Sequence, residues 1–235
     1  MGKLRDLRKN VLAALKAEPW PRGLDTLAGH SPKALIGPLY ALLLEPDPLV
    51  RWRAATAFGG NAARLFADRP EDARQLMRQL MWRLNEESGN IAWGIPEAFG
   101  ETLAAQPVLA SEFHRVLASY IRELDFKTGD TFIDHAPLRR SVYWALARLA
   151  AVSPRLVLPV LPDLLAPHSS DDAESRGYAA LAVGRLLPVA GDAAGPAREA
   201  LAGLRGDGAE FDLYEGGYLA RVSVGEVAGK MCGAS

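Results

Sequence analysis

The most constraining feature of this 235-residue chain is an apolar pattern that recurs about every 40 residues. The segment EPDPLVRWRAATAFG ends at Gly59, and EESGNIAWGIPEAFG ends 41 residues later, at Gly100. Two further segments of this kind end at Ala147 and Gly184, at offsets of 47 and 37 residues. Internal periods of this length are typical of arrays of paired helices. We therefore expect four copies of one helical unit, stacked in sequence order.

The columns of this alignment have the spacing of one helical face. In each segment, residues at offsets of 0, 4, 7 and 8, all apolar except Ser175, trace one side of an α-helix. In chain order, the four sets are Val50, Ala54, Ala57 and Phe58; Ile91, Ile95, Ala98 and Phe99; Leu138, Val142, Ala145 and Leu146; and Ser175, Ala179, Ala182 and Val183. A single pair of helices cannot bury such a stripe, so neighbouring pairs must stack.

A first helix is expected in each pair, packed against the striped second helix. The expected ranges are 32–44, 70–84, 108–124, 154–165 and 193–204. Helix-start signals agree, because a capping residue precedes a proline at Ser31, Asp47 and Ser153. In such a pair, the first residue supplies the N-cap side chain. The proline that follows begins the helix and has no N–H group that would need an acceptor.

One segment resembles the turn and second helix of a HEAT-type repeat. Within DPLVRWRAATAFG, the matching residues are Asp47, Pro48, Val50, Arg51, Ala54, Ala57 and Gly59. The resemblance covers roughly residues 30–205 and implies an all-α superhelix, a solenoid of HEAT-like repeats that serves mainly as a scaffold. The stretch RLNEESGNIAWGIPEAFGE also resembles small prokaryotic HEAT-repeat proteins of unassigned function.

The C-terminal residues break the helical rhythm. Between Phe211 and Val224, apolar and polar residues alternate around a Gly-Gly pair, which predicts a β-hairpin. Ser223 and Glu226 then have the spacing of a capping box that opens a final helix. The alternative is one more degenerate helical pair. We expect capping helices over 1–30, repeats over 31–209 and a hairpin-plus-helix cap over 210–235, in one structural domain.

The composition limits the function classes. A formal net charge of −1 disfavours nucleic-acid binding, which usually needs a basic excess. The single cysteine, Cys232, cannot form a disulfide within the chain or a cysteine zinc site. No apolar run approaches membrane-spanning length and no signal peptide is recognisable. We therefore expect a cytoplasmic protein that is a monomer or a weak homodimer and does not bind membranes.

A helical wheel places candidate partner-binding residues opposite the buried stripe. Trp52, Trp93 and Arg140 occupy that column of the repeats. The complete set of candidates is Trp52, Trp93, Glu97, Arg139, Arg140, Tyr143 and Trp144. Aromatic residues and arginine are the types that anchor protein interfaces. The alternative is that the tryptophans fill space between neighbouring repeats.

The second repeat is irregular. Gly94 and Pro96 both fall where the alignment requires a helix, and proline inside a helix costs about 3 kcal/mol or more. Either the helix starts late, near Ile95, or it is kinked. Because functional sites often break local rules, residues 85–97 are the first candidate segment for a site; a tolerated kink is the alternative.

Catalytic chemistry is sparse, and we predict no catalytic residue, no metal and no cofactor. None of the four histidines precedes a glutamate or pairs with another histidine at helical spacing. One enzyme reading is a HEAT-like alkylpurine DNA glycosylase, in which Trp93 and Glu97 would share a helix face and Arg139 and Arg140 would grip DNA phosphates. The main prediction is a non-enzymatic interaction module that binds a protein or peptide on its concave face.

Overall fold

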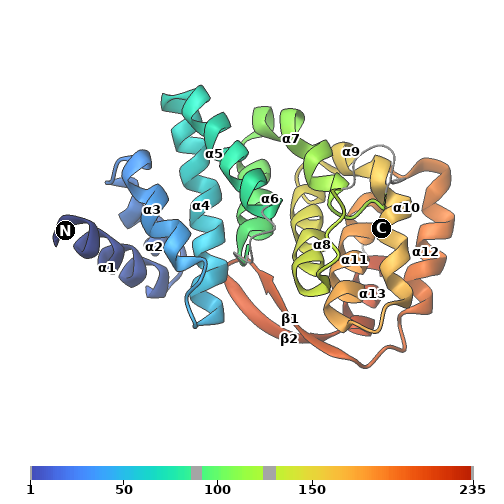
Figure 1. The fold of residues 1–235 in the computed structure, drawn as a ribbon. Coiled ribbons are helices and arrows are strands. Elements are labelled where there is room, and N and C mark those ends of the chain that lie inside the picture. Colours follow the sequence, from blue (N-terminus) through green and yellow to red (C-terminus); the bar gives the residue numbers. More distant parts are fainter. Residues whose placement is uncertain (1, 86–91, 124–130, 234–235) are drawn as a thin grey trace. The chain divides into compact units, whose positions relative to one another are not determined.

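The computed structural model describes residues 2–85, 92–123 and 131–233, which form α-helices and one β-hairpin (Figure 1). The chain divides into two compact units. Unit 1 comprises residues 1–109 and 214–218, and unit 2 comprises 110–213 and 219–235. The predicted all-α helical-repeat fold with a C-terminal hairpin is confirmed.

Unit 1 contains the N-terminal helices. They are α1 (Gly2–Lys16), α2 (Pro21–Ala28), α3 (Pro32–Leu42), α4 (Pro48–Asp68), α5 (Pro70–Leu84) and α6 (Ile95–Ala105). The long second helix α4 packs against α3, α5 and α6. The predicted boundaries of α3 and α5 are confirmed to within two residues. The Gly-Gly pair at 59 and 60 does not end α4, which continues for two more turns.

The predicted stripe of α4 is buried. Val50, Ala54, Ala57 and Phe58 are all at most 3% exposed. Asp47 caps this helix, because its Oδ1 accepts hydrogen bonds from the backbone N–H groups of Leu49 (3.0 Å) and Val50 (3.4 Å). The same cap recurs in unit 2, where Asp172 accepts from the N–H of Ser175 at 2.9 Å. Ser31 and Ser153 stand at N-cap positions, but their side chains make no capping hydrogen bond.

Unit 2 contains the C-terminal helices and short 3-10 turns. The α-helices are α7 (Pro107–Ser119, which begins in unit 1), α8 (Ala136–Ala150), α9 (Pro154–Val157), α10 (Leu161–Leu165), α11 (Ala173–Leu186), α12 (Ala194–Gly203) and α13 (Val224–Gly233). The 3-10 turns are η1 (Leu158–Val160), η2 (Ala166–Ser169), η3 (Leu187–Val189) and η4 (Gly191–Ala193). The second helices α8 and α11 pack against each other, and α11 also packs against α13.

Several predictions about the helices of unit 2 need correction. The continuous helix expected over 154–165 is divided into α9, η1 and α10, because Pro159 and Pro162 lack the N–H groups that an uninterrupted helix requires. The helix expected to reach residue 124 ends at Ser119. Leu138 of the predicted stripe is only half-buried, and Ile91 lies outside the described residues.

The predicted hairpin is present, and the alternative of a further helical pair is wrong. Strands β1 (Glu210–Glu215) and β2 (Tyr218–Ser223) pair through a turn at Gly216 and Gly217, whose φ angles are 63° and 94°. Two consecutive positive φ values need glycine, since side chains strain that conformation. The capping box is also confirmed. The N–H of Ser223 donates to Glu226 Oε2 at 2.7 Å, and the N–H of Glu226 donates back to Ser223 Oγ at 3.2 Å.

Across the described ranges, no helix combines the length and the apolar character that crossing a membrane would require.

Candidate binding surfaces

An arginine at the fourth position after the N-cap recurs in three second helices. Arg51 donates to the carbonyl oxygens of Glu45 and Pro46 at 2.9 and 3.0 Å. Its counterpart Arg139 donates to the carbonyls of Ile133 and Asp134 at 2.6 and 3.0 Å. Arg176 donates in the same way to the Ser170 carbonyl at 2.6 Å. Arg139, predicted to hold a partner, therefore fixes the turn that precedes its own helix.

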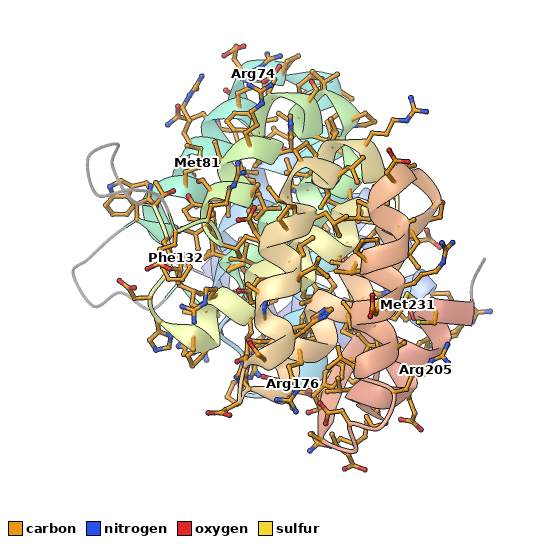
Figure 2. All side chains as sticks on the ribbon, turned by 90° about the vertical axis from the view of Figure 1, so that its right-hand side faces the viewer. Arg74, Met81, Phe132, Arg176, Arg205 and Met231 are labelled. Atoms are coloured by element: carbon orange, nitrogen blue, oxygen red, sulfur yellow. The ribbon has the colours of Figure 1, made fainter. Side chains whose placement is uncertain are left out.

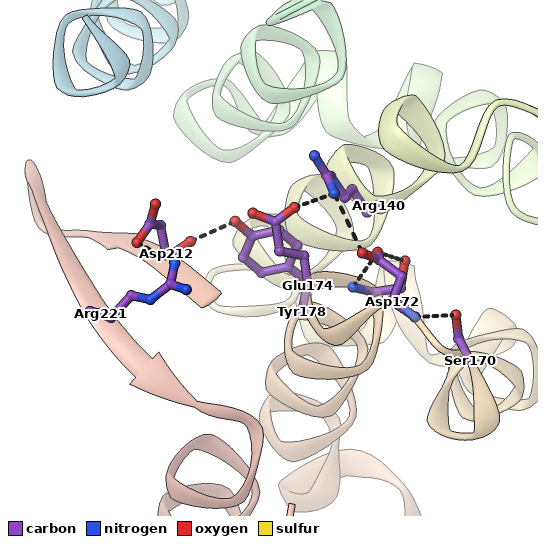
Figure 3. A network of polar contacts seen from close by, with 8 residues as sticks. Arg140, Ser170, Asp172, Glu174, Tyr178, Asp212 and Arg221 are labelled. Carbon is purple, nitrogen blue, oxygen red and sulfur yellow. Dashed lines mark hydrogen bonds and ion pairs between the residues drawn. The ribbon is translucent and has the colours of Figure 1, made fainter. Parts of the chain in front are cut away.

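Arg140 is also engaged within unit 2 (Figure 3). Its Nη1 lies 2.5 Å from Glu174 Oε2 and 3.4 Å from Asp172 Oδ1. Burial raises the pKa of the Glu174 carboxyl, and this effect exceeds the opposing influence of Arg140. Acidic neighbours therefore already hold the Arg140 guanidinium, and its contact with DNA phosphates stays a prediction.

In unit 1, the hairpin turn covers the α4 face that was expected to be open. The Trp52 and Tyr214 rings stack with centroids 5.1 Å apart and an angle of 12° between planes. The Thr56 hydroxyl, one turn further along α4, lies 2.9 Å from the Tyr214 hydroxyl. Trp52 is therefore half-buried beneath residues of the same chain.

The irregular second repeat begins its helix late, as one of the two alternatives proposed. Gly94 occupies the N-cap position with φ 75°, and α6 starts at Ile95. A Cβ at Gly94 would meet the Leu43 side chain at 2.9 Å, so both the backbone conformation and the close approach need glycine. Residues 86–91 of the candidate segment 85–97 lie outside the described residues.

Trp93 and Glu97 do not share a helix face. Trp93 lies in the turn before α6, whereas Glu97 lies in the first turn of that helix, and both are half-buried. The glycosylase reading assumed one continuous helix through both residues, and that assumption is wrong. Within the described ranges, no group of three or more His, Cys, Asp or Glu side chains could hold a metal ion.

Tyr143 and Trp144 are buried within the fold. Tyr143 is 6% exposed and Trp144 is 3% exposed, so neither side chain presents an open surface, and Trp144 fits the alternative that it fills space within the fold. Burial raises the pKa of Tyr143, and a hydrogen bond from Arg139 partly opposes that rise. Whether the seven candidate residues contact a partner stays a prediction.

Arg53, a buried polar residue of unit 1 with several partners, was not singled out by any sequence pattern. Its side chain is 1% exposed and donates to the carbonyls of Gly217 and Leu15, each at 3.0 Å. The guanidinium also pairs with Glu18 at 2.5 Å and lies 4.7 Å from the centroid of the Trp20 ring. One clue was available, because Arg53 directly precedes the buried stripe residue Ala54. Its partners, up to 164 residues away, are not indicated by any local pattern.

Unit 2 contains a cavity of about 340 Å³, which we call the unit 2 pocket. It brings together two of the predicted residues, Arg139 and Tyr143, both from α8. Other lining residues include Ile121, Phe132, Asp163 and Ser175. The Arg139 guanidinium lies 4.8 Å from the centroid of the Phe132 ring, which is labelled in Figure 2. Asp163, from α10, pairs through Oδ2 with Arg122 Nε at 3.1 Å.

The walls of the unit 2 pocket differ in exposure. Tyr143 and Ser175 are buried, with exposures of 6% and 5%. Glu123, Ala166 and Ser169 also line the cavity and are exposed to solvent. The pocket therefore has both exposed and buried walls, and α8, α10, η2 and α11 position most of its lining side chains.

No family model matches the sequence, and no curated protein matches it. Solved structures are similar in fold. An engineered protein has a TM-score of 0.52 and 16% identity, and the match covers 97% of this chain and 95% of that chain. A set of computationally designed armadillo repeat proteins for modular peptide recognition has a TM-score of 0.49 and 16% identity, with 96% and 90% covered. The chain therefore shares the helical fold of that engineered protein.

Proposed function

We propose that this chain is a non-enzymatic interaction module that binds a segment of a partner protein, and that the unit 2 pocket holds part of that segment. The pocket itself carries this proposal. It is concave, most of its lining residues lie on α8, α10, η2 and α11, and its volume falls within the range of ligand-binding cavities. Its lining combines polar and charged side chains with the apolar side chains of Ile121, Phe132 and Pro167.

The fold supports the same function. Stacked repeats present extended surfaces on which partner segments can lie. The α4 face of unit 1 is occupied by the hairpin turn through Tyr214, which favours a site elsewhere. Among the predicted residues, Arg139 and Tyr143 line a cavity, so the α8 side of unit 2 is the preferred surface.

Blocking the unit 2 pocket tests this proposal. The full chain is applied to an array of short peptides of random sequence, and retained peptides are measured by fluorescence. Ala166→Trp places an indole at an exposed wall of the pocket and should abolish or strongly weaken binding of the retained peptides. The matched control is Ala202→Trp, at an exposed position of α12 in the same unit. If wild type retains no peptide, or if both variants bind equally, the proposed function is wrong.

We further propose that the module works in the cytoplasm as a monomer or a weak homodimer. The single free thiol at Cys232 is consistent with a reducing compartment. Sedimentation velocity over a concentration series measures the oligomeric state, and cell fractionation measures the location. A stable higher oligomer or a membrane-bound pool would contradict these two assignments.

A further inference from the structure

We propose that the α4 face of unit 1 is a second peptide-binding site, which the chain's own hairpin tip occupies in the structure. The partner that this site fits is a segment with a tight turn of the pattern Tyr-x-Gly-Gly. The hairpin tip is Tyr214–Tyr218, which belongs to unit 1. This inference does not depend on the unit 2 pocket, because it rests on the contacts by which unit 1 holds the tip.

The side chain of Tyr214 is held in the way that a recognised aromatic residue is held. Its ring is buried and stacks on the Trp52 indole, with centroids 5.1 Å apart. Its hydroxyl lies 2.9 Å from the Thr56 hydroxyl, which donates its one proton to Glu101 Oε1 at 3.0 Å. Tyr214 is therefore the donor in the contact with Thr56. The site distinguishes tyrosine from phenylalanine, because only a phenol supplies this hydrogen bond.

The glycine turn fits unit 1 through its shape and its backbone. Gly217 lies so close to the Trp20 indole that an added Cβ would overlap the ring. Its carbonyl accepts a hydrogen bond from Arg53 Nε at 3.0 Å. The Arg53 guanidinium also lies 5.5 Å from the centroid of the Tyr218 ring. Main-chain hydrogen bonds combined with sites for particular side chains are the usual means of peptide recognition, and the tip makes both kinds of contact.

The receiving surface is built by helices that pack on one another. Trp52, Arg53 and Thr56 lie on α4, and Glu101 lies on α6. Helix α4 packs against α3, α5 and α6. The tip, by contrast, joins the strands of a sheet that has only two strands within the described ranges, and such a hairpin is marginally stable by itself. A partner turn can therefore replace the tip while the helices that receive it stay packed.

The experiment uses the full chain and a cyclised, fluorescein-labelled peptide of residues 210–223, with binding measured by fluorescence anisotropy. In wild type the tip competes with the peptide at an effective concentration of about 1 mM. Gly217→Ala should displace the tip, because the added Cβ overlaps Trp20 and the φ angle is 94°. This variant should bind the peptide at least about tenfold more tightly than wild type.

Gly216→Ala is the matched control for the displaced tip. It introduces the same kind of backbone strain, at a φ angle of 63°, but its added Cβ meets no atom within 4 Å. It should therefore bind the peptide like wild type. Tighter binding by both glycine variants would attribute the effect to turn strain and would contradict the fit of the tip against Trp20.

The phenol contact gives a readout that a general change in folding does not move. In the Gly217→Ala protein, a peptide with phenylalanine in place of Tyr214 should bind about 2- to 10-fold more weakly, as expected for one neutral hydrogen bond. Thr56→Val in the protein should weaken the tyrosine peptide by a similar factor and leave the phenylalanine peptide unchanged. Trp52→Ala should abolish binding of both peptides.

Thermal melts check that each variant is folded. Should Gly217→Ala not fold, Tyr214→Ala replaces it, since this change removes the ring stack and the hydrogen bond without straining the backbone. The inference is wrong if the displaced variant binds no better than wild type or if both peptides bind equally. It is also wrong if neither tip variant folds, because the tip is then an obligatory part of unit 1. The proposed function of the unit 2 pocket is decided separately, by Ala166→Trp.

Discussion

Two adjacent glycines in α4 should respond in opposite ways to the same substitution. A Cβ at Gly59 would lie 2.6 Å from the backbone carbon and oxygen of Glu101 in α6. A Cβ at Gly60, one residue later in the same helix, would meet nothing within 4 Å. Both substitutions change the helix propensity of α4 equally, and only Gly59→Ala disturbs the packing of α4 on α6. The difference in stability between the two variants therefore measures the packing effect alone.

The magnitudes follow from these contacts. Replacing glycine by alanine inside a helix stabilises it by about 0.8–1 kcal/mol. Gly60→Ala should gain about that amount, since the added methyl group is unopposed. At Gly59 the clash is with backbone, which cannot rotate away, and overpacking typically costs about 1–3 kcal/mol or more. Because 2.6 Å is far inside van der Waals contact, the upper part of that range, about 2–3 kcal/mol, applies, and Gly59→Ala should be destabilising by about 1–2 kcal/mol after the helix gain is subtracted.

Thermal and urea melts of the two variants measure this difference. For a chain of this size, about 1 kcal/mol corresponds to a shift of about 2–4 °C in Tm, so the two variants should fall on opposite sides of wild type. Circular dichroism at the helix band and tryptophan fluorescence should give the same order. Equal stabilisation by both substitutions would refute the close approach of α4 and α6 and the register that places Gly59 there.

Three further predictions concern buried groups. Arg53→Met should destabilise unit 1 by about 3–5 kcal/mol, because it leaves Glu18 and two backbone carbonyls without their hydrogen-bond donor. The control is Arg78→Met, at an exposed position of α5. Similar melting curves for both variants would contradict the buried network around Arg53. Ala57→Asp, which buries an unpaired carboxylate, should cost about 3 kcal/mol or more in the same melts, and a wild-type curve would show that the stripe is misplaced. Burial lowers the pKa of His168, so the folded state binds its proton less readily than the unfolded state. The folded state therefore has its full stability, as far as His168 is concerned, above the unfolded-state pKa of about 6.5. It loses stability as the pH falls from there toward the lower pKa of His168 in the folded state. Urea melts across this range should show a smaller loss of stability on acidification for His168→Gln than for wild type, and an unchanged slope would contradict the assignment.

The sequence predicted the features that depend on neighbouring residues. The offsets of the apolar columns identified the stripe of α4, including Val50 and Phe58, since helical periodicity is a local property. The cap at Asp47 was predictable for the same reason, because the backbone N–H groups that donate to its side chain lie within three residues. The Gly-Gly turn of the hairpin was predictable because two consecutive positive φ values need glycine.

The predicted binding face depended on an assumption that local patterns cannot test. The helical wheel took the side opposite the buried stripe to be open and placed Trp52 there; Gly59, nine residues after Val50 in the same helix, falls on the same side. In the structure Gly59 contacts α6 and Trp52 stacks on Tyr214. The same error applies to Gly184, where an added Cβ would lie 2.3 Å from the Met231 side chain of α13 (labelled in Figure 2). When a second helix is packed on two opposite sides, small and apolar residues occur on both. Helical periodicity in the sequence then does not show which side, if either, is open to solvent.

One repeat position carries a buried polar side chain in both units. It directly precedes the second residue of the apolar stripe, which is Ala54 in α4 and Ala179 in α11. In the repeat alignment Arg53 of α4 corresponds to Tyr178 of α11. Arg53 Nε donates to the Gly217 carbonyl at 3.0 Å in unit 1, and the Tyr178 hydroxyl donates to the Asp212 carbonyl at 2.8 Å in unit 2. A two-stranded hairpin leaves outward carbonyls without ladder partners, and burying them unpaired would cost about 1–3 kcal/mol each. The same repeat position therefore supplies the missing donor in each unit, and on these two helices the chain itself uses the face on which a partner was expected.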